Sequence, residues 1–463
     1  MDKPTPTIAA ALAATTPDGL PPRQRAFAFL AIAIAVTMAV LDTAIVNVAL
    51  PSISQALAVD AAQAVWVVNA YQLAVTVSLL PLAALGDRLG YKRVYWGGLA
   101  VFTLASLACA RAPTLALLAG ARVVQGLGAA GIMSVNIALV RSLFPKAQLG
   151  VGMGYASLTV AVSSAAGPTL AAAVLAVADW KWLFLINVPL GAIALLVAAL
   201  ALPASPTSHR RVDALSVLLN ALTFGPLIGG LGYFGEAGGA QRGGALVAVG
   251  LACGAALLRR ERRSAHPVLP LDLLRLPVFV LSLATSIGAF AAQTMALIAL
   301  PFYFERTLGM SETATGLLMT PWPLATALVA PLAGRLSDRF APGRLCIAGM
   351  LCLAAGLAGV AALGGTPDRI GIAWRLAVCG LGFGLFQSPN NRVIMGSAPR
   401  ERSGGASGLQ ALGRLLGQSL GAVAAALLFA LGPADPTAAL ATGAASLALL
   451  AAGTSAMRRK PAP

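Results

Sequence analysis

One acidic residue of this 463-residue chain lies well inside a long apolar run, where a charge is costly. Asp42 interrupts the largely apolar stretch 26–50, whereas the other Asp and Glu residues fall in polar segments or close to the ends of apolar runs. A carboxylate within hydrocarbon costs several kcal/mol unless it is protonated, paired or hydrated, so an acid at such a position indicates function. The sequence predicts that Asp42 binds and releases a proton, with a buried structural ion pair as the alternative.

Arg122 is the predicted partner of Asp42, because the two residues lie at the same depth in their apolar runs. Asp42 is eight residues from the end of its run and Arg122 is eight residues from the start of the run 114–140. At helical rise this places both about 12 Å below the same surface. A guanidinium and a proton then compete for one carboxylate, and movement can switch between them. Gln125 and Asn136 share a helical face with Arg122, which predicts a polar stripe facing a cavity.

The second half of the chain offers neutral and aromatic side chains where the first half has its acid. By alignment of the two halves, Ala292 and Gln293 stand opposite the position of Asp42. Aromatic rings attract cations through their faces, so the combination predicts a cavity for lipophilic compounds. The predicted cavity residues are Tyr71, Gln125, Asn136, Phe290, Gln293, Trp322, Phe386, Gln387, Asn390 and Asn391.

Arg414 is another cation inside an apolar run, and it has two interpretations. The favoured one is a hydrogen bond from its guanidinium to a neighbouring backbone carbonyl. If the guanidinium faces the cavity instead, an anionic substrate is indicated.

Helices that span a membrane must position these side chains. The chain is 58% hydrophobic and 10% charged, against about 25% charged in ordinary soluble domains, which argues against a soluble fold. A spanning helix needs about 20 mostly apolar residues, and fourteen such runs predict an all-α integral membrane protein. The predicted spans are 26–50, 62–85, 94–110, 114–140, 150–177, 182–202, 212–233, 243–258, 278–303, 313–333, 345–364, 370–396, 404–430 and 437–456.

The positions of the Lys and Arg residues predict the orientation of these spans. With the N-terminus inside the cell, cytoplasmic segments hold 24 of the 32 basic residues, outer loops hold five and spans hold three. Cytoplasmic loops of membrane proteins carry such an excess, so the tails 1–25 and 457–463 are expected in the cytoplasm and the protein in the inner, cytoplasmic membrane. The same distribution explains the net charge of +16 without a nucleic-acid partner.

The two halves of the chain share one sequence pattern. GDRLGYKR (Gly86–Arg93) and LSDRFAPGR (Leu336–Arg344) align at an offset of 251, and Gly126, Asn136 and Gly167 recur 254 residues later. Parallel repeats of this kind form two bundles that rock about a central site. The predicted parts are six-helix bundles at 26–202 and 278–456 and a linker with two inserted spanning helices at 203–277.

Four segments resemble motifs of the major facilitator superfamily. They are LDTAIVNVALPSI (Leu41–Ile53), GDRLGYKR, RVVQGLGAA (Arg122–Ala130) and GPTLAA (Gly167–Ala172), and they look like its fourteen-span drug:proton antiporter branch of multidrug and quaternary-ammonium exporters. The resemblance extends over nearly the whole chain. It implies the major facilitator fold, a small-molecule substrate, protons as the coupling ion without any other cofactor, and activity as a monomer.

The resemblance also assigns a gating role to the two basic loops. In this family the loop acid belongs to a conformational latch, which bonds to a helix N-terminus or an Arg and breaks when the bundles move. The residues expected to form this gate are Asp87, Arg88, Arg93, Asp338, Arg339 and Arg344.

Small residues carry a further part of the resemblance. The antiporter motif of the fifth helix has Ser163, Ala171 and Ala172 where glycine is usual, and these are still small enough for close helix contact. The helix-packing residues expected from this motif and from RLLGQSLG are Gly154, Gly167, Pro168, Gly417 and Gly421.

Other chemistry finds no support in the sequence. There is no GxxxxGK[ST] loop for ATP, and His209 and His266 stand alone in polar linkers, so neither a catalytic site nor a metal site is predicted. The five cysteines lack CxxC spacing and are interpreted as free core thiols. The predicted function is proton-coupled efflux of lipophilic, cationic compounds. The alternative is an importer or facilitator of a neutral or anionic metabolite.

Overall fold

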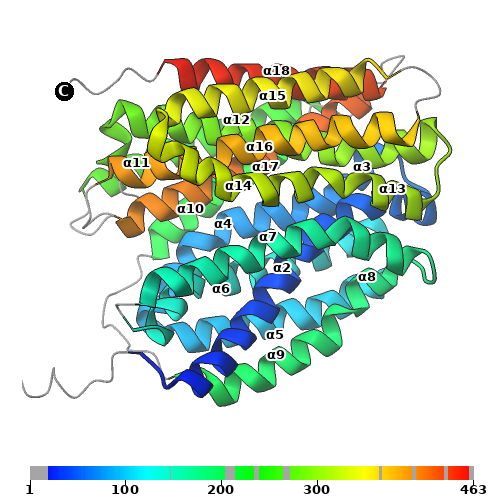
Figure 1. The fold of residues 1–463 in the computed structure, drawn as a ribbon. Helices are drawn as coiled ribbons and strands as arrows, with labels where there is room; N and C mark the ends of the chain where they lie inside the picture. Colours follow the sequence, from blue (N-terminus) through cyan, green and yellow to red (C-terminus); the bar gives the residue numbers. More distant parts are fainter. Residues whose placement is uncertain are drawn as a thin grey trace, which may run out of the picture.

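The computed structural model describes residues 19–145, 148–203, 214–233, 239–263, 272–363, 368–398, 403–431 and 436–457. Within these ranges the regular secondary structure is entirely helical, which confirms the predicted fold class (Figure 1). Most of the predicted cytoplasmic tails, and the segments 204–213, 234–238 and 264–271 of the predicted linker, lie outside the described residues.

The first half of the chain forms eight helical segments, and the second half forms a comparable set after an inserted pair. The first set comprises α2 (Pro22–Ala56), α3 (Ala61–Ala64), α4 (Trp66–Leu89), α5 (Tyr91–Ala110), α6 (Leu115–Leu143), α7 (Leu149–Leu175), α8 (Lys181–Leu185) and α9 (Asn187–Ala201). The inserted pair is α10 (Ala214–Tyr233) and α11 (Ala240–Arg263). The second set comprises η2 (Leu273–Arg275), α12 (Pro277–Phe302), η3 (Tyr303–Thr307), α13 (Glu312–Met319), α14 (Pro321–Arg339), α15 (Pro342–Ala361), α16 (Arg369–Ser397), α17 (Ser403–Ala430) and α18 (Pro436–Ala456).

Twelve helices among the described residues are long and apolar enough to cross a membrane. Two shorter apolar helices, Leu215–Leu231 and Ala441–Ala456, lie where the other two spans were predicted. The multi-pass architecture agrees with the sequence analysis, while a total of fourteen spans stays a prediction.

Equivalent helices pack in the same way in the two halves. In Figure 1 the helices of each half form a group, and the two groups lie next to each other. In the first half α2 packs on α7, and α6 packs on α4 and α5; in the second half α12 packs on α17, and α16 packs on α14 and α15. One close contact is repeated in detail. A Cβ added to Gly128 would lie 2.4 Å from the Phe102 nitrogen, and one added to Gly382 would lie 2.4 Å from the Leu353 nitrogen. These glycines are 254 residues apart, so the sequence repeat corresponds to a repeated helix crossing.

The two halves are joined at the end of the molecule that contains Ser54, which we name the Ser54 end. A single apolar cluster there includes Leu50 and Ile53 of the first half and Phe302 and Phe304 of the second. Polar contacts also cross this junction. Arg306 Nη2 donates to Ser54 Oγ at 2.6 Å, Ser52 Oγ donates to Glu312, and the hydroxyls of Thr169 and Thr320 are 2.8 Å apart. Both apolar and polar contacts therefore hold the Ser54 end together.

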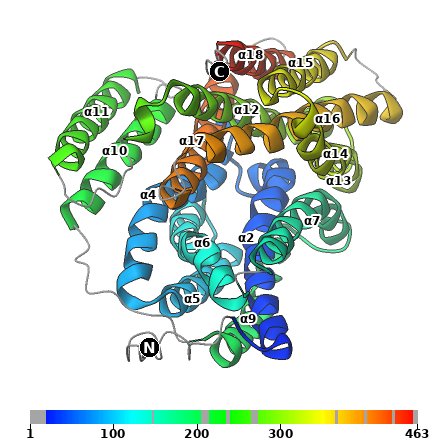
Figure 2. The ribbon, with the colours of Figure 1, turned by 60° about the vertical axis from the view of Figure 1, so that its left-hand side comes forward.

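The inserted helices α10 and α11 pack against each other beside the two bundles (Figure 2). Helix α10 contacts α4 of the first bundle and α17 of the second. Pro81 lies inside α4 and has no N–H to offer the carbonyl of Val77, four residues earlier. Asn220 Nδ2 of α10 donates to that carbonyl at 2.8 Å. The inserted pair thus supplies a hydrogen bond that the bundle helix lacks.

Candidate functional site

Four helices of the first bundle bring polar side chains together inside the protein. Asp42 comes from α2, Tyr71 from α4, Ser106 from α5, and Arg122 and Gln125 from α6. The exposed fractions of Asp42, Arg122 and Gln125 are 2%, 1% and 0%. We call these five residues the central cluster. Its position within long apolar helices removes water as a hydrogen-bond partner, so the side chains must satisfy one another.

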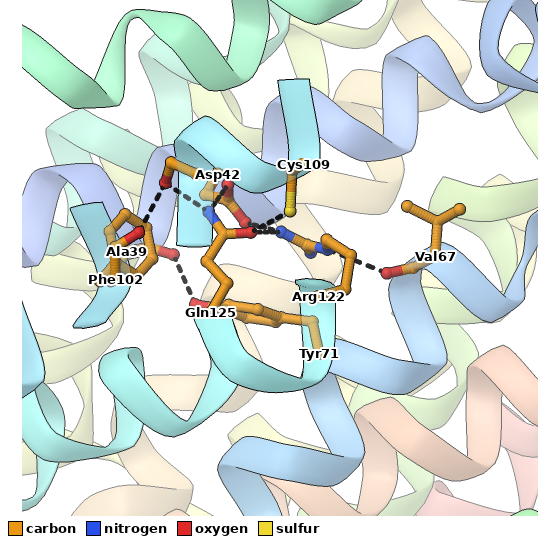
Figure 3. Close-up of polar contacts among 9 residues, drawn as sticks. Ala39, Asp42, Val67, Tyr71, Phe102, Cys109, Arg122 and Gln125 are labelled. Carbon is orange, nitrogen blue, oxygen red and sulfur yellow. Dashed lines mark hydrogen bonds and ion pairs between the residues drawn. The ribbon is translucent and has the colours of Figure 1, made fainter. Parts of the chain in front are cut away.

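The predicted partners Asp42 and Arg122 are in direct contact (Figure 3). Arg122 Nη1 donates to Asp42 Oδ2, and Gln125 Nε2 donates to Asp42 Oδ1 at 2.7 Å. Arg122 Nη1 also donates to Gln125 Oε1 at 2.7 Å, and its Nε donates to the Val67 carbonyl at 3.0 Å. Both oxygens of the carboxylate are therefore already acceptors. Adding a proton would neutralise the carboxylate and so weaken its attraction to the Arg122 guanidinium, which links protonation of Asp42 to this ion pair.

Aromatic rings cover the rest of the Arg122 guanidinium. Its Cζ lies 4.2 Å from the centre of the Tyr71 ring and 5.7 Å from that of Phe184. A guanidinium over a ring face is stabilised by the ring quadrupole. Tyr71 was predicted as a cavity residue, and the structure places its ring against the cation of the central cluster.

Sequence reasoning missed three members of this network. Ser106 accepts from Gln125 Nε2 at 2.9 Å and donates to the Phe102 carbonyl, and the Cys109 thiol lies 3.4 Å from Gln125 Oε1. The Val67 carbonyl is a backbone group, which no residue type signals. Gln125 was predicted in the cavity wall, and the structure instead shows it bridging Asp42, Arg122 and Ser106. Nothing in the sequence around Ser106 indicates that this serine of α5 contacts Gln125 of α6.

The predicted cavity residues of the second half divide into an aromatic group and a polar group. The Phe290 and Phe383 rings are 5.2 Å apart and the Phe383 and Phe386 rings 5.9 Å apart. The buried Nε1 of Trp322 has no hydrogen-bond partner among the described residues. Asn390 Nδ2 donates to Ser286 Oγ at 2.8 Å, which ties α16 to α12.

Four of the predicted polar cavity residues are partly exposed. Asn136, Gln293, Gln387 and Asn391 are all half-buried. Asn136 Oδ1 is buried and accepts no hydrogen bond within the described part of the chain. A role for these residues in substrate binding stays a prediction.

Arg414 differs from the favoured expectation. Its Nε is buried and makes no hydrogen bond, and the described residues provide no carbonyl partner for the guanidinium. The side chain is half-buried on α17. Helix α17 packs against α4 of the first bundle, the helix that carries Tyr71.

The two predicted gating loops have different backbone geometry. Asp87 is exposed and accepts a hydrogen bond from the Tyr91 hydroxyl at 2.8 Å. Gly90 ends α4 at φ +93°, a left-handed conformation that favours glycine, whereas Ala341 takes φ −56° before Pro342. The arginines of both loops, Arg88, Arg93, Arg339 and Arg344, are exposed, and the side chain of Asp338 lies outside the described residues.

Four of the predicted packing residues lie at close helix contacts, within one bundle for Gly167, Gly417 and Gly421 and between the bundles for Pro168. A Cβ on Gly167 would meet Ala44 of α2 at 2.5 Å, and one on Gly421 would meet the Ala291 carbonyl of α12 at 2.3 Å. Gly417 approaches the Ile287 carbonyl, and the Pro168 carbonyl lies against Gly316. Gly154 is in α7, and its surroundings lie outside the described side chains.

Comparison with known proteins agrees with this architecture. The uncharacterized transporter YebQ of Escherichia coli (strain K12) is 52% identical over 443 residues, 95% of this chain and 97% of that protein. The multidrug resistance protein Stp of Mycobacterium tuberculosis (strain CDC 1551 / Oshkosh) is 32% identical over 404 residues, 86% of this chain and 75% of that protein.

Solved structures share the fold at low sequence identity. A bacterial homolog of the human lysosomal transporter Spinster, in an inward-facing and occupied conformation, gives a TM-score of 0.68 at 15% identity, covering 96% of this chain and 100% of the other. The family model of the Major Facilitator Superfamily matches residues 32–422. Because that match spans most of the chain, this protein is a member of the major facilitator superfamily.

Proposed function

We propose that this transporter exports lipophilic small molecules from the cell in exchange for protons. The observation that carries the proposal is the buried Asp42 carboxylate, held by Arg122 and Gln125 inside apolar helices. An intramembrane acid at a bundle interior is the usual place for proton binding. Similarity to a multidrug resistance protein supports export of drugs or biocides.

The proposed location is the inner, cytoplasmic membrane, with both termini in the cytoplasm and the single chain as the working unit. This orientation follows from the excess of Lys and Arg in the segments assigned to the cytoplasm. It makes the Ser54 end the outer end. The contacts between Ser54 and Arg306 and between Ser52 and Glu312 then close the outer side, from which we infer that the described state faces inward.

Exchange requires that proton and substrate favour different states of the central cluster. In the inward-facing state Asp42 accepts from Arg122 and Gln125, so it is an ionised acceptor without a proton. We infer that opening of the Ser54 end also shifts α2 within the first bundle, because such a shift would separate Asp42 from its partners and let an outer proton bind it. Return to the inward-facing state re-forms the pair and releases the proton inside.

A cationic substrate was predicted because Asp42 is the acid within a span. For a cation to bind there it must replace Arg122 or Gln125, both of which donate to Asp42 in the described state. A preference for cationic substrates therefore requires the central cluster to rearrange, so that Arg122 or Gln125 no longer donates to Asp42. The unpartnered Arg414 favours the other candidate, transport of a neutral or anionic compound, over a purely cationic preference.

Proton exchange can be measured in proteoliposomes that contain the full chain and a pH-sensitive dye. With an acidic lumen, addition of a transported lipophilic dye should collapse the pH gradient in the wild type. Asp42→Asn should remove this response because the amide cannot take up a proton, while dye binding to the purified protein remains. Undiminished gradient collapse by Asp42→Asn would refute the assignment of Asp42. Asp60→Asn removes a carboxylate outside the cluster, at a helix N-cap where Asn caps as well as Asp, and serves as a charge control.

A further inference from the structure

Arg414 is a half-buried cation that the proposed proton site does not use. Its Nε makes no hydrogen bond, and among the described residues the guanidinium has no ion-pair partner. A buried N–H of a guanidinium without an acceptor costs free energy unless a ligand or water completes its hydrogen bonding.

The packing of α17 directs Arg414 toward the space between the bundles. Gly413 and Gly417 face α12, where an added Cβ would meet Leu283 at 2.4 Å and the Ile287 carbonyl at 2.5 Å. Leu415 belongs to the apolar cluster of the first bundle. At about 100° per residue, Arg414 projects between the face that contacts α12 and the face that contacts the first bundle.

Tyr71 connects Arg414 to the central cluster. Its ring lies 4.2 Å from the Arg122 Cζ, and its helix α4 packs against α17, which carries Arg414. The acid of the cluster is already occupied by Arg122 and Gln125. Asp42, Arg122 and Arg414 together carry one more positive than negative charge when all three are ionised.

An aromatic surface lies close to Arg414. A Cβ added to Gly417, one turn further along α17, would be 2.9 Å from Phe290 Cβ. The Phe290 ring makes an edge contact with Phe383, at 5.2 Å between centres. Phe290 and Phe383 are 7% and 2% exposed, so a flat lipophilic ligand would reach these rings where the bundles separate, with an acidic group on it directed to the guanidinium.

We propose that Arg414 is the subsite for an anionic group of the substrate, and that the preferred substrates are aromatic compounds carrying a carboxylate or a similar anion. The guanidinium offers planar, paired donors that match a carboxylate. The proposal rests on the proposed function only in placing the substrate between the two bundles. It replaces a purely cationic preference by one that requires an acidic group.

Binding of matched probes to the purified full chain in nanodiscs tests this subsite without any proton gradient. The probes are 1-pyrenebutyrate and its methyl ester, which share one ring system and differ in the charge. The wild type should bind the carboxylate at least about tenfold more tightly than the ester, as expected for a charge-assisted pair. Arg414→Gln should abolish that difference and leave the affinity for the ester within about twofold.

Three controls separate this result from a general loss of structure or from the proton hypothesis. Arg414→Lys should keep part of the preference, since it keeps the charge. Arg375→Gln, which alters an arginine already bonded to the Gly371 carbonyl at 2.8 Å, should keep all of it. Asp42→Asn should also keep it, even if proton exchange is lost. Equal wild-type affinity for acid and ester, no binding of the acid, or an unchanged preference in Arg414→Gln would overturn the assignment.

Discussion

At the scale of single residues, the geometry of the central cluster is fixed because each of its buried polar atoms has few possible hydrogen-bond partners. Arg122 makes contacts in three directions: to Asp42, to the Gln125 oxygen and to the Val67 carbonyl. Its remaining surface lies on the Tyr71 ring. Removing one partner leaves others buried and unpaired, so the function of Asp42 depends on the geometry of Arg122 as much as on its charge.

Substitutions of Arg122 test how much geometry matters. Arg122→Ala leaves the Asp42 carboxylate and the Val67 carbonyl without this donor, and breaking a buried pair in this way costs about 3–5 kcal/mol. We expect a lower thermal unfolding temperature in detergent and no proton exchange. Arg122→Lys keeps the charge but not the fork of donors, so it should recover stability in part and exchange weakly. If Arg122→Ala matched the wild type in both assays, the contact would have no functional importance.

At the scale of elements, the inserted pair α10–α11 does more than connect the bundles. Helix α10 touches one helix of each bundle, and Asn220 completes the hydrogen bonding of α4 at Pro81. A proline inside a spanning helix leaves a carbonyl free, and in a membrane a neighbouring helix must provide the donor. The proline at position 81 of α4 thus explains why α10 carries an amide side chain, Asn220, at this contact.

A double-mutant cycle tests this dependence. Asn220→Ala should destabilise the protein by about 1–3 kcal/mol, because the Val77 carbonyl stays buried without a donor. Pro81→Ala restores an N–H in α4, so Asn220→Ala made in that background should cost less. Thermal unfolding of the four proteins in one detergent gives the coupling. Additive effects of the two changes would mean that Asn220 and Pro81 are independent.

At the scale of the whole molecule, alternating access requires the closed Ser54 end to open. The junction consists of an apolar cluster shared by both halves and hydroxyl or charged contacts between them. The threonine pair Thr169 and Thr320 joins α7 to the segment between α13 and α14, with 2.8 Å between hydroxyls. Such a pair is close enough to be replaced by a covalent bridge that prevents separation.

Cysteines at these two positions should stop transport when they are oxidised. The five native cysteines are free thiols and can first be replaced. In that background Thr169→Cys with Thr320→Cys should form a disulfide that locks the Ser54 end, so that dye export falls to background and returns on reduction. Each single cysteine variant, treated in the same way, should keep exporting. Full cross-linking with unchanged transport would show that this junction does not need to open.

Patterns that depend on local composition were readable from the sequence. Runs of apolar residues predicted the helices, because a spanning helix needs length and hydrophobicity whatever its neighbours are. The repeat offsets predicted equivalent packing, and the glycines at 128 and 382 make the same close contact in both halves. The pairing of Asp42 with Arg122 could be predicted because the depth of a residue in its span follows from counting residues along the sequence.

Only the tertiary structure decided which side chains on different helices satisfy one another. Sequence analysis expected Arg414 to bond to a carbonyl and Gln125 to line a cavity, whereas the structure leaves the Arg414 Nε unpartnered and gives Gln125 to Asp42. Ser106 and the amide of Asn220 carried no sequence signal. The physical reason is that a hydrogen bond between helices depends on their rotation and distance of approach. Those are set by packing along the whole length of each helix and not by the residues that form the bond.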